Sequence, residues 1–343
     1  MRGYGMKHFL AKALLLGVLF FGFAGWAQAA HLRKTNPDLT VQKWYGNAID
    51  YSGYRVGQSP DLKIYPSQAQ VLEDMTILKK NWKLVLLYGG DKHSQDVLEV
   101  IQRNKLGIKI VLGLWLDGRA GFEAKNAEQI ATAIRLANQY KKIVIAVNVG
   151  NEMLVSWSDH KLTEDKAIEY VEQVRKAVSC PVTVADDLLY WRQPQARLAD
   201  HVDFIVMHTY PMWGHEDIDT AMPSTIKHYE EVRKAHPGKA IVLGEAGWAS
   251  YSVGNQHVPR AGDEKKQKRY YEELNAWAKA NNVTTFYFEA FDEPWKGTGT
   301  EGHWGLFSVD RKAKLAMQEL YPELMPAGPT SPSYDPPTGS AVK

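Results

Sequence analysis

Residues 143–152 (IVIAVNVGNE) and 240–248 (AIVLGEAGW) are two apolar runs that each lead through a glycine to a glutamate. A run that is apolar at almost every position is typical of a strand buried on both faces of a parallel sheet. The two glutamates, Glu152 and Glu245, stand 93 positions apart (245 − 152). We therefore expect both carboxylates just beyond the carboxyl ends of two strands of one sheet.

The rest of the chain alternates between further apolar runs and segments with apolar residues at helical spacing. Six more runs are predicted as strands: 41–49, 83–88, 108–116, 181–185, 204–208 and 284–291. The segments predicted as helices are 68–80, 96–103, 126–140, a helix beginning at Thr163, 224–235, 263–280 and a short closing helix at 313–320. Eight buried strands that alternate with helices or loops predict an α/β protein with a single (β/α)8 TIM barrel, placed at residues 30–321. No glycine-rich phosphate loop follows these runs, which argues against a nucleotide-binding sheet.

Both ends of the chain differ in composition from the barrel segment. Basic residues precede an apolar run at 13–24, and Ala27-Gln28-Ala29 supplies a small-x-small cleavage site, so residues 1–29 are predicted to be a signal peptide. A membrane anchor is the alternative, but the run is shorter than the roughly 20 apolar residues of a spanning helix. We expect cleavage after Ala29, no stable membrane insertion afterwards, and export to the periplasm, the cell envelope or the medium. Residues 322–343, rich in Pro and Ser, are expected to be a disordered extension or linker.

Composition limits the partners that the protein is expected to bind. The chain of 343 residues has a net charge of +2, which gives no electrostatic case for nucleic acid. Its lone cysteine, Cys180, excludes an intrachain disulfide and is expected to be a small buried residue. Eleven Trp and 17 Tyr can fill a large core or stack on sugar rings. We expect a monomer.

The predicted positions of the two glutamates define a chemistry. In a (β/α)8 barrel, functional residues gather at the carboxyl ends of the strands. Glu152 follows the fourth predicted strand and Glu245 the seventh, so the two carboxylates face each other across the mouth. Such a pair is what cleavage of a glycosidic bond needs, because one acid protonates the leaving oxygen and the other attacks the sugar carbon. The sequence has neither an HExxH motif nor a Cys/His cluster, so we expect no catalytic metal and no cofactor.

The residues around these glutamates carry a family resemblance. Asn151-Glu152 and 244–248 (GEAGW) look like the acid/base and nucleophile motifs of retaining glycosidases built on this barrel. The segment 288–296 (FEAFDEPWK), followed by Glu301, resembles glycoside hydrolase family 17, the β-1,3-glucanases and glucanosyltransferases. The loop that begins at Tyr51 (YSGY) resembles the fungal and bacterial branch. The likeness runs in order from about Trp44 to Arg311.

The resemblance implies a retaining hydrolase of β-1,3-glucan that works through a covalent glucosyl-enzyme. Glu152 would be the general acid/base, held protonated near neutral pH, and Glu245 the ionised nucleophile. Retention implies carboxyl groups about 5–5.5 Å apart. Asn151 would hydrogen-bond the sugar 2-hydroxyl, and Tyr210 would donate its hydroxyl to Glu245.

Further residues are assigned to substrate binding, and several have a structural alternative. Asp187 reaches a sugar hydroxyl or caps a turn, and Glu289 lines the cleft or pairs with Lys296. Trp248 and Trp295 stack on sugars or pack in the core. The remaining residues assigned to the cleft by resemblance are Tyr51, Glu293, Lys296 and Glu301. His208 and His303 are expected to be hydrogen-bonded structural residues.

Three other functions remain open from the sequence. The first is a β-1,3-glucanosyltransferase that uses the same site, and the second is a relative that acts on β-1,4-glucan or mannan. The third is a non-catalytic glucan-binding protein of the cell envelope. A matched acid and nucleophile argue against the third, because a binding protein has no use for them.

Overall fold

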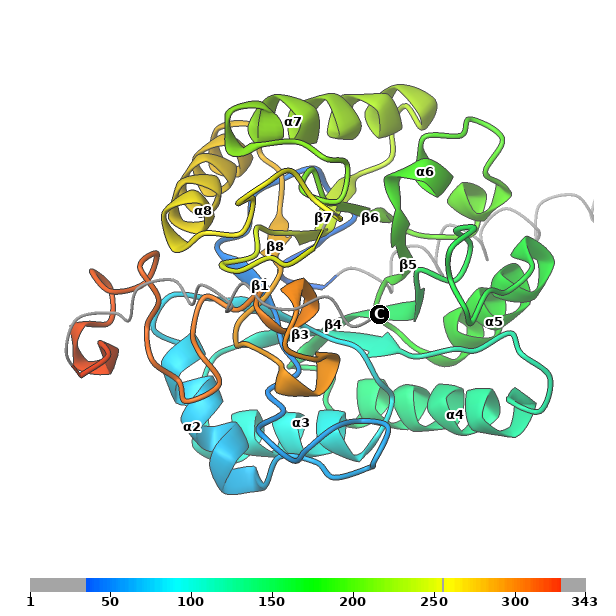
Figure 1. The fold of residues 1–343 in the computed structure, drawn as a ribbon. Coiled ribbons are helices and arrows are strands. Elements are labelled where there is room, and N and C mark those ends of the chain that lie inside the picture. The colour runs from blue at the N-terminus through cyan, green and yellow to red at the C-terminus, as the bar shows by residue number, and fades with distance from the viewer. Residues whose placement is uncertain (1–34, 255, 328–343) are drawn as a thin grey trace, which may run out of the picture.

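A closed barrel of eight parallel strands forms the centre of the molecule (Figure 1). The computed structural model describes residues 35–254 and 256–327. The strands are β1 (Ala48–Asp50), β2 (Leu84–Leu87), β3 (Lys109–Leu114), β4 (Val144–Asn151), β5 (Val182–Asp187), β6 (Ile205–Thr209), β7 (Ile241–Ala246) and β8 (Thr285–Tyr287). Each strand pairs in parallel with its neighbours in the sequence, and β8 closes on β1.

The helices surround the barrel as an outer ring (Figure 1). They are α2 (Gln68–Leu78), α3 (Lys92–Asn104), α4 (Glu123–Gln139), α5 (Glu164–Ala177), the short α6 (Leu188–Trp191), α7 (Ile218–Ala235) and α8 (Glu264–Ala280). Short 3-10 helices are η1 (Arg197–Asp200), η2 (Pro294–Lys296), η3 (Thr300–Gly302) and η4 (Pro322–Leu324). The predicted (β/α)8 TIM barrel is confirmed.

The strands are apolar throughout because each is buried on both faces. Along β2, Leu84 and Leu86 belong to the cluster inside the barrel, whereas Val85 and Leu87 pack against the helices. Successive side chains of a strand point to opposite faces, so both faces need apolar residues here. The inner cluster ends below the mouth, where polar side chains take over the inward positions.

Local signals in the sequence set several helix starts. Ser67 caps α2 in a capping box with Gln70, and Thr163 caps α5 as its predicted first residue. Asp187, the last residue of β5, accepts a hydrogen bond from Leu189 N and so begins α6. This cap fixes the direction in which the chain leaves β5 at the mouth.

Four predicted elements are clearly wrong in extent or in type. The strand predicted at 41–49 is reduced to β1, and the one at 284–291 to β8. The closing helix at 313–320 is a series of turns, although its apolar residues have helical spacing. The helix predicted to start at residue 224 starts at Ile218, because Asp217 caps it and buried residues on its first turns outweigh the cost of Pro223 inside it.

The two ends of the barrel segment are joined by a buried ion cluster. Asp74 on α2 accepts hydrogen bonds from Arg311, at 2.7 and 2.8 Å, and from Arg55, at 3.0 and 3.2 Å. Asp74 is fully buried, and the Tyr51 hydroxyl donates to its Oδ2 at 2.9 Å. The cluster therefore ties the loop after β1 to a segment that follows β8.

The predicted signal peptide at 1–29 lies outside the described residues, as does the tail from residue 328 onward. Within the described range, η4 continues the ordered chain beyond Tyr321, and Ala313 N donates to Leu324 O at 2.8 Å. Among the described residues we find no helix that combines the length and the apolar character needed to cross a membrane.

Candidate active site

Glu152 stands at a sharp change of direction after β4. Gly150 has φ +100°, and Glu152 itself has φ +46°, a left-handed conformation that is uncommon for a residue other than glycine. Two backbone contacts hold the turn: Glu152 N donates to Ala185 O at 3.0 Å, and Leu154 N donates to Asp186 Oδ2 at 2.9 Å. Strain held in place by its surroundings is typical of functional sites. The turn keeps Glu152 half-buried at the mouth.

Glu245 lies within β7, not beyond it as predicted, and is buried. Its neighbour Gly244 leaves room for β6, because a Cβ there would collide with the side chain of Val206 and crowd the ring of His208. Two tyrosine hydroxyls donate to the Glu245 carboxylate: Tyr88 to Oε1 at 2.9 Å and Tyr210 to Oε2. The predicted Tyr210 hydrogen bond is confirmed.

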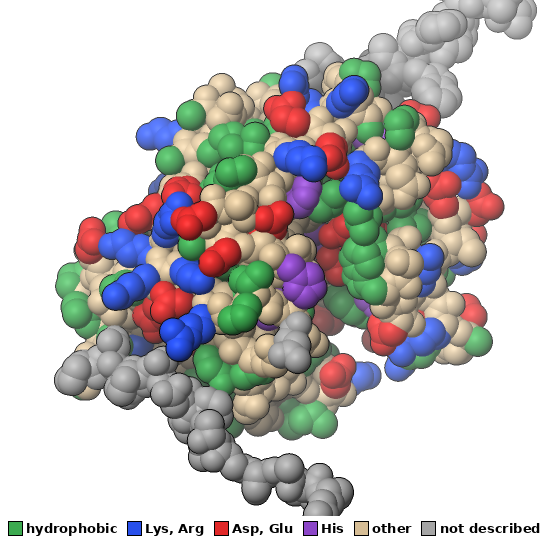
Figure 2. Space-filling model, turned by 45° about the horizontal axis from the view of Figure 1, so that its top comes forward, with side chains coloured by type: hydrophobic (Ala, Val, Ile, Leu, Met, Phe, Trp, Pro, Cys, Tyr) green, Lys and Arg blue, Asp and Glu red, His purple; other side chains and the backbone are tan. Residues whose placement is uncertain are grey.

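His208 brings the two carboxylates into one cluster. Its Nδ1 lies 3.0 Å from Glu152 Oε1 and 3.4 Å from Glu245 Oε2. One oxygen of each glutamate and a ring nitrogen of His208 all lie within 4.8 Å of one another. The face of the molecule shown in Figure 2 is hollowed near its middle, and acidic side chains line part of the hollow. The two predicted acids therefore meet at one site.

The pKa shifts in the cluster differ from the prediction that Glu152 is protonated and Glu245 is ionised. Burial acts to raise the pKa of Glu152, but the hydrogen bond and charge of His208 outweigh it, and the Glu152 pKa is lowered overall. Burial raises the pKa of Glu245, although His208 and the two tyrosines act in the opposite direction. For His208, burial lowers the pKa, and the two glutamates more than offset this and raise it to about 9. In the free protein the proton expected on Glu152 therefore resides on His208.

Two further predicted binding residues lie near the catalytic cluster. Asn151 ends β4, and its Oδ1 is buried with no hydrogen-bond partner among the described residues. Glu301 is exposed on η3, where partial burial and the charges of Glu245 and Glu152 raise its pKa. Both side chains remain candidates for contact with substrate.

Three predicted binding residues have structural roles instead. Tyr51 is 1% exposed and serves the Asp74 cluster, so it is not available to a sugar. Trp248 is 0% exposed and donates its indole N–H to Ala261 O at 2.9 Å, which makes it part of the core. Asp187 is buried and caps α6, the structural alternative considered for it.

The segment after β8 forms a buried ion cluster. The Lys296 ammonium lies 3.3 Å from Glu289 Oε1 and 2.5 Å from Glu293 Oε2, and both glutamates are almost fully buried. Glu289 therefore pairs with Lys296, while Glu289 Oε2 and Glu293 Oε1 are buried with no hydrogen-bond partner among the described residues. Lys296 and Trp295 are half-buried, and Trp295 makes an edge contact with Tyr54.

Four residues at the mouth were not predicted as functional. Tyr88 contacts the carboxylate of Glu245, and His208 contacts that of Glu152. Each stands two positions after an inward-facing residue of its strand, which is a signal that could have found them. Trp115 and Trp157 are 45% and 54% exposed, and hydrogen bonding from Trp157 helps to lower the pKa of Glu152. Tryptophan is rarely this exposed in a folded protein, so both are candidates for stacking on sugar rings.

Glu152, His208 and Glu245 are also the described residues whose donor atoms are close enough to hold a metal ion. These atoms are already engaged, since His208 bonds to Glu152 and two tyrosines donate to Glu245. The arrangement fits proton transfer and nucleophilic attack.

A closed (β/α)8 barrel that brings two carboxylates together at one mouth fits a glycoside hydrolase. A sequence model of the BtgE/BtgC glycoside hydrolase domain matches residues 48–305. The chain belongs to this family.

Relatives and solved structures agree with this assignment. The chain is 29% identical over 298 residues to a probable glucan endo-1,3-beta-glucosidase, btgC, of Aspergillus fumigatus, covering 79% of this chain and 42% of that protein. It therefore spans less than half the length of this relative. A glucan 1,3-beta-glucosidase of Arthroderma benhamiae is 26% identical, with 72% of this chain and 84% of that protein covered.

Two solved structures share the fold and are at least 25% identical in sequence to this chain. An endo-laminarinase from Formosa superposes with a TM-score of 0.76 at 27% identity, covering 84% of this chain and 89% of that one. The glycoside hydrolase family 17 β-1,3-glucanosyltransferase from Rhizomucor miehei gives 0.67 at 25% identity, covering 80% and 97%.

Proposed function

We propose that the protein is a retaining glycosidase that acts on β-1,3-glucan, with Glu245 as nucleophile and Glu152 as general acid/base. The observation that carries the proposal is the separation of the acids, since one oxygen from each lies within 4.8 Å of the other. Retaining enzymes hold their carboxyl groups about 5–5.5 Å apart, whereas inverting enzymes need roughly 6.5–9.5 Å to admit a water molecule. The names of the relatives support β-1,3-glucan as the substrate.

In the first step, Glu245 attacks the anomeric carbon and the glycosidic C–O bond breaks. The proton moves from His208 Nδ1 to Glu152 Oε1, across 3.0 Å, and Glu152 passes it to the leaving oxygen. The hydroxyls of Tyr88 and Tyr210 stabilise the carboxylate of Glu245 before attack. The products are a glucosyl ester of Glu245 and a free glucan end.

In the second step, Glu152 removes a proton from an incoming water or sugar hydroxyl, which attacks the same carbon and releases Glu245. The proton returns to the Glu152–His208 pair, so the cycle is balanced. We assign the contact with the sugar 2-hydroxyl to Asn151, whose buried Oδ1 has no hydrogen-bond partner among the described residues. Water gives hydrolysis and a sugar hydroxyl gives transglycosylation, and the relatives include both kinds of enzyme.

The decisive experiment traps the intermediate. A 2-fluoro glycoside of laminaribiose should label Glu245, as detected by mass spectrometry of peptides, and NMR of early products should show the β-anomer. Glu245→Gln should lower kcat by at least about 10³-fold, because the nucleophile is lost. Glu128→Gln, at an exposed position on α4, is the matched control. A first-formed α-anomer, or full activity of Glu245→Gln, would falsify the assignment.

We also propose that the protein is exported after removal of residues 1–29 and belongs to the branch of the family that has fungal and bacterial members. The predicted signal peptide supports export. Mass spectrometry of the mature N-terminus tests this proposal, which requires Ala30 as the first residue.

A further inference from the structure

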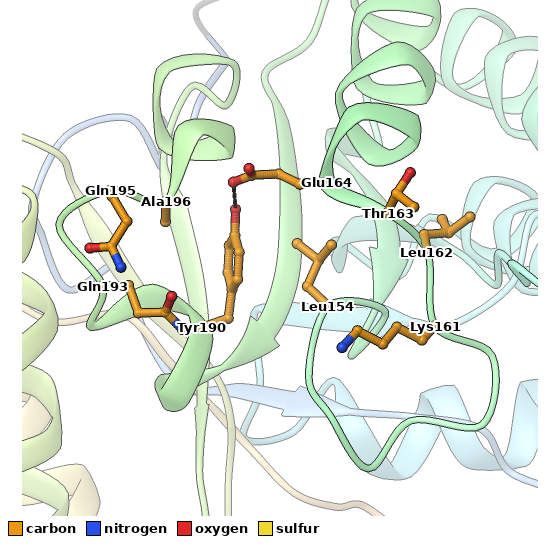
Figure 3. Close-up of a pocket in the computed structure, with 9 residues that line it drawn as sticks. All are labelled: Leu154, Lys161, Leu162, Thr163, Glu164, Tyr190, Gln193, Gln195 and Ala196. Atoms are coloured by element: carbon orange, nitrogen blue, oxygen red, sulfur yellow. Dashed lines mark hydrogen bonds between the residues drawn. The ribbon is translucent and has the colours of Figure 1, made fainter.

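A cavity of about 550 Å³ opens beside the loop that follows Glu152. Its walls come from two segments that leave the barrel at the mouth, the one between β4 and α5 and the one that follows β5. The residues that line it are Leu154, Lys161, Leu162, Thr163, Glu164, Tyr190, Gln193, Gln195 and Ala196. Figure 3 shows Tyr190 and the two glutamines on one side and Leu154 and Lys161 on the other. None of these residues belongs to the catalytic cluster.

The position of the cavity matches the path of a leaving group. Leu154 is two residues beyond Glu152 and is fixed by its hydrogen bond to Asp186 at the end of β5. The residues that line the cavity follow β4 and β5, whereas Glu245 lies on β7. In a double displacement the sugar under attack lies between the two acids, and the leaving oxygen lies next to the general acid. The chain on the leaving side must therefore extend past Glu152, toward β4 and β5.

The chemistry of the lining suits a neutral, hydroxyl-rich ligand. The half-buried carboxylate of Glu164 is already satisfied, because Oε1 accepts from Tyr190 OH at 2.7 Å and Oε2 from Arg197 Nε at 2.8 Å. Gln193 donates to Leu189 O at 2.6 Å, which leaves its carbonyl oxygen as an acceptor. Within the described part of the chain, Lys161 Nζ and the Gln195 amide have no hydrogen bond or ion pair.

Apolar surface lies opposite these polar groups. Leu154 and the ring of Tyr190 stand on facing walls, and Ala196 lies beside Gln195 (Figure 3). A volume of this size is within the range of small-molecule pockets and exceeds the space of one sugar ring. An amphipathic slot with donors and acceptors at its rim is what a short stretch of glucan needs.

We infer that this cavity is an acceptor-side subsite that binds glucosyl units of the leaving or incoming β-1,3-glucan chain. The inference rests on the proposed function and adds the residues that select for chain length. Units bound here help to place the glycosidic oxygen near Glu152 in the first step and an acceptor hydroxyl in the second.

The test compares a long substrate with a short one that does not reach the cavity. The long substrate is laminarihexaose, and the short one is an aryl β-laminaribioside, whose leaving group is a single phenol. The double variant Lys161→Ala/Gln195→Ala removes two exposed side chains and leaves the fold intact. It should lower the ratio of kcat/KM for the hexaose to that for the aryl glycoside about tenfold, since each lost hydrogen bond weakens binding several-fold.

Two additional variants sharpen this result. Gln195→Trp fills the cavity and should reduce the same ratio at least as much, with a raised acceptor KM if transfer products form. Lys141→Ala/Lys142→Ala changes two exposed lysines just before β4, at the opposite end of the barrel, and should leave the ratio at the wild-type value.

The outcomes separate the inference from the proposed function. If both substrates are cleaved and the ratio stays at the wild-type value in both cavity variants, the cavity is not a subsite, while the proposed function stands. If the wild-type protein cleaves neither substrate, the proposed function and the inference both fall.

Discussion

His208 Nδ1 lies 3.0 Å from Glu152 Oε1, so the general acid/base proposed above shares its proton with a buried imidazole. A buried histidine whose pKa is raised to about 9 keeps its proton across the neutral range. In the proposed mechanism, the proton needed for the first step is therefore held next to Glu152. The predictions below follow from this arrangement and from the packing that supports it.

His208→Gln should change the pH profile of kcat/KM. In the wild-type protein the shared proton is lost only as pH rises through about 9, the pKa of His208, so activity should persist to that range. In the variant the proton must stay on Glu152 alone, and the basic limb should move to lower pH. Rates on an aryl laminaribioside between pH 4 and 10 measure the limb. A basic limb at an unchanged pH in an active variant would show that His208 does not hold this proton.

Trp157→Ala should weaken substrate binding and also perturb Glu152. Loss of an exposed ring that can stack on sugar should lower kcat/KM about fivefold, in line with the roughly 1 kcal/mol of an aromatic contact. Hydrogen bonding from Trp157 favours the ionised form of Glu152, so its removal should raise the Glu152 pKa. Trp157→Phe keeps the ring but not the N–H, and should recover KM without restoring the pH profile. Equal KM values in the Ala and Phe variants would argue against stacking.

Asp50→Asn should alter how stability depends on pH. Asp50 is fully buried on β1, and burial together with Glu245 and Glu289 raises its pKa well above the usual value of 3.8. The folded state therefore keeps a proton that the unfolded state releases, and this costs stability as pH rises above about 4. Asn does not ionise, so the free energy of unfolding of the variant minus that of the wild type should increase from pH 5 to pH 8. Urea titrations at both values measure it, and a difference that is independent of pH would contradict a protonated Asp50.

Asp74→Ala should destabilise the fold by about 3–5 kcal/mol, because it leaves the buried Arg311 guanidinium without its partner. The adjacent Glu73→Ala is a matched control. Glu73 contacts Arg55 at 2.8 Å but is largely exposed, so its loss should cost less than about 1 kcal/mol. Thermal and urea unfolding compare the two. Similar losses in both variants would mean that burial does not govern the strength of this cluster.

The sequence was sufficient to predict the barrel and the meeting of Glu152 and Glu245 at one mouth, for physical reasons. Runs such as residues 143–152 are apolar on both faces, and a parallel barrel is the fold that buries both. Strand order then placed Glu152 and Glu245 at one mouth. The segment at 313–320 had the same helical spacing as the true helices, yet it forms turns, because spacing alone does not report what a segment packs against.

The binding residues were harder to predict because the type of a residue does not determine whether its side chain is exposed. Trp248 and Trp157 are the same amino acid in loops that follow catalytic strands, but one is in the core and the other is half exposed. Tyr51 matched a family motif and nevertheless faces Asp74. The sequence predicts a structural role for His208. Its contact with Glu152 was missed because it depends on the register between β6 and its neighbours, which no single strand reveals.

The buried contact between Asp74 and Arg311 also bears on how far this chain can be shortened. The family match ends at residue 305, six positions before Arg311. A protein trimmed to that limit would retain Glu152, Glu245 and every strand, yet it would lose Arg311, which donates two of the hydrogen bonds that Asp74 accepts. It would also lose Tyr321, whose ring stacks on Trp82 at 6.3 Å. We therefore expect the smallest fragment that folds by itself to extend past Tyr321, beyond the residues that the family model matches.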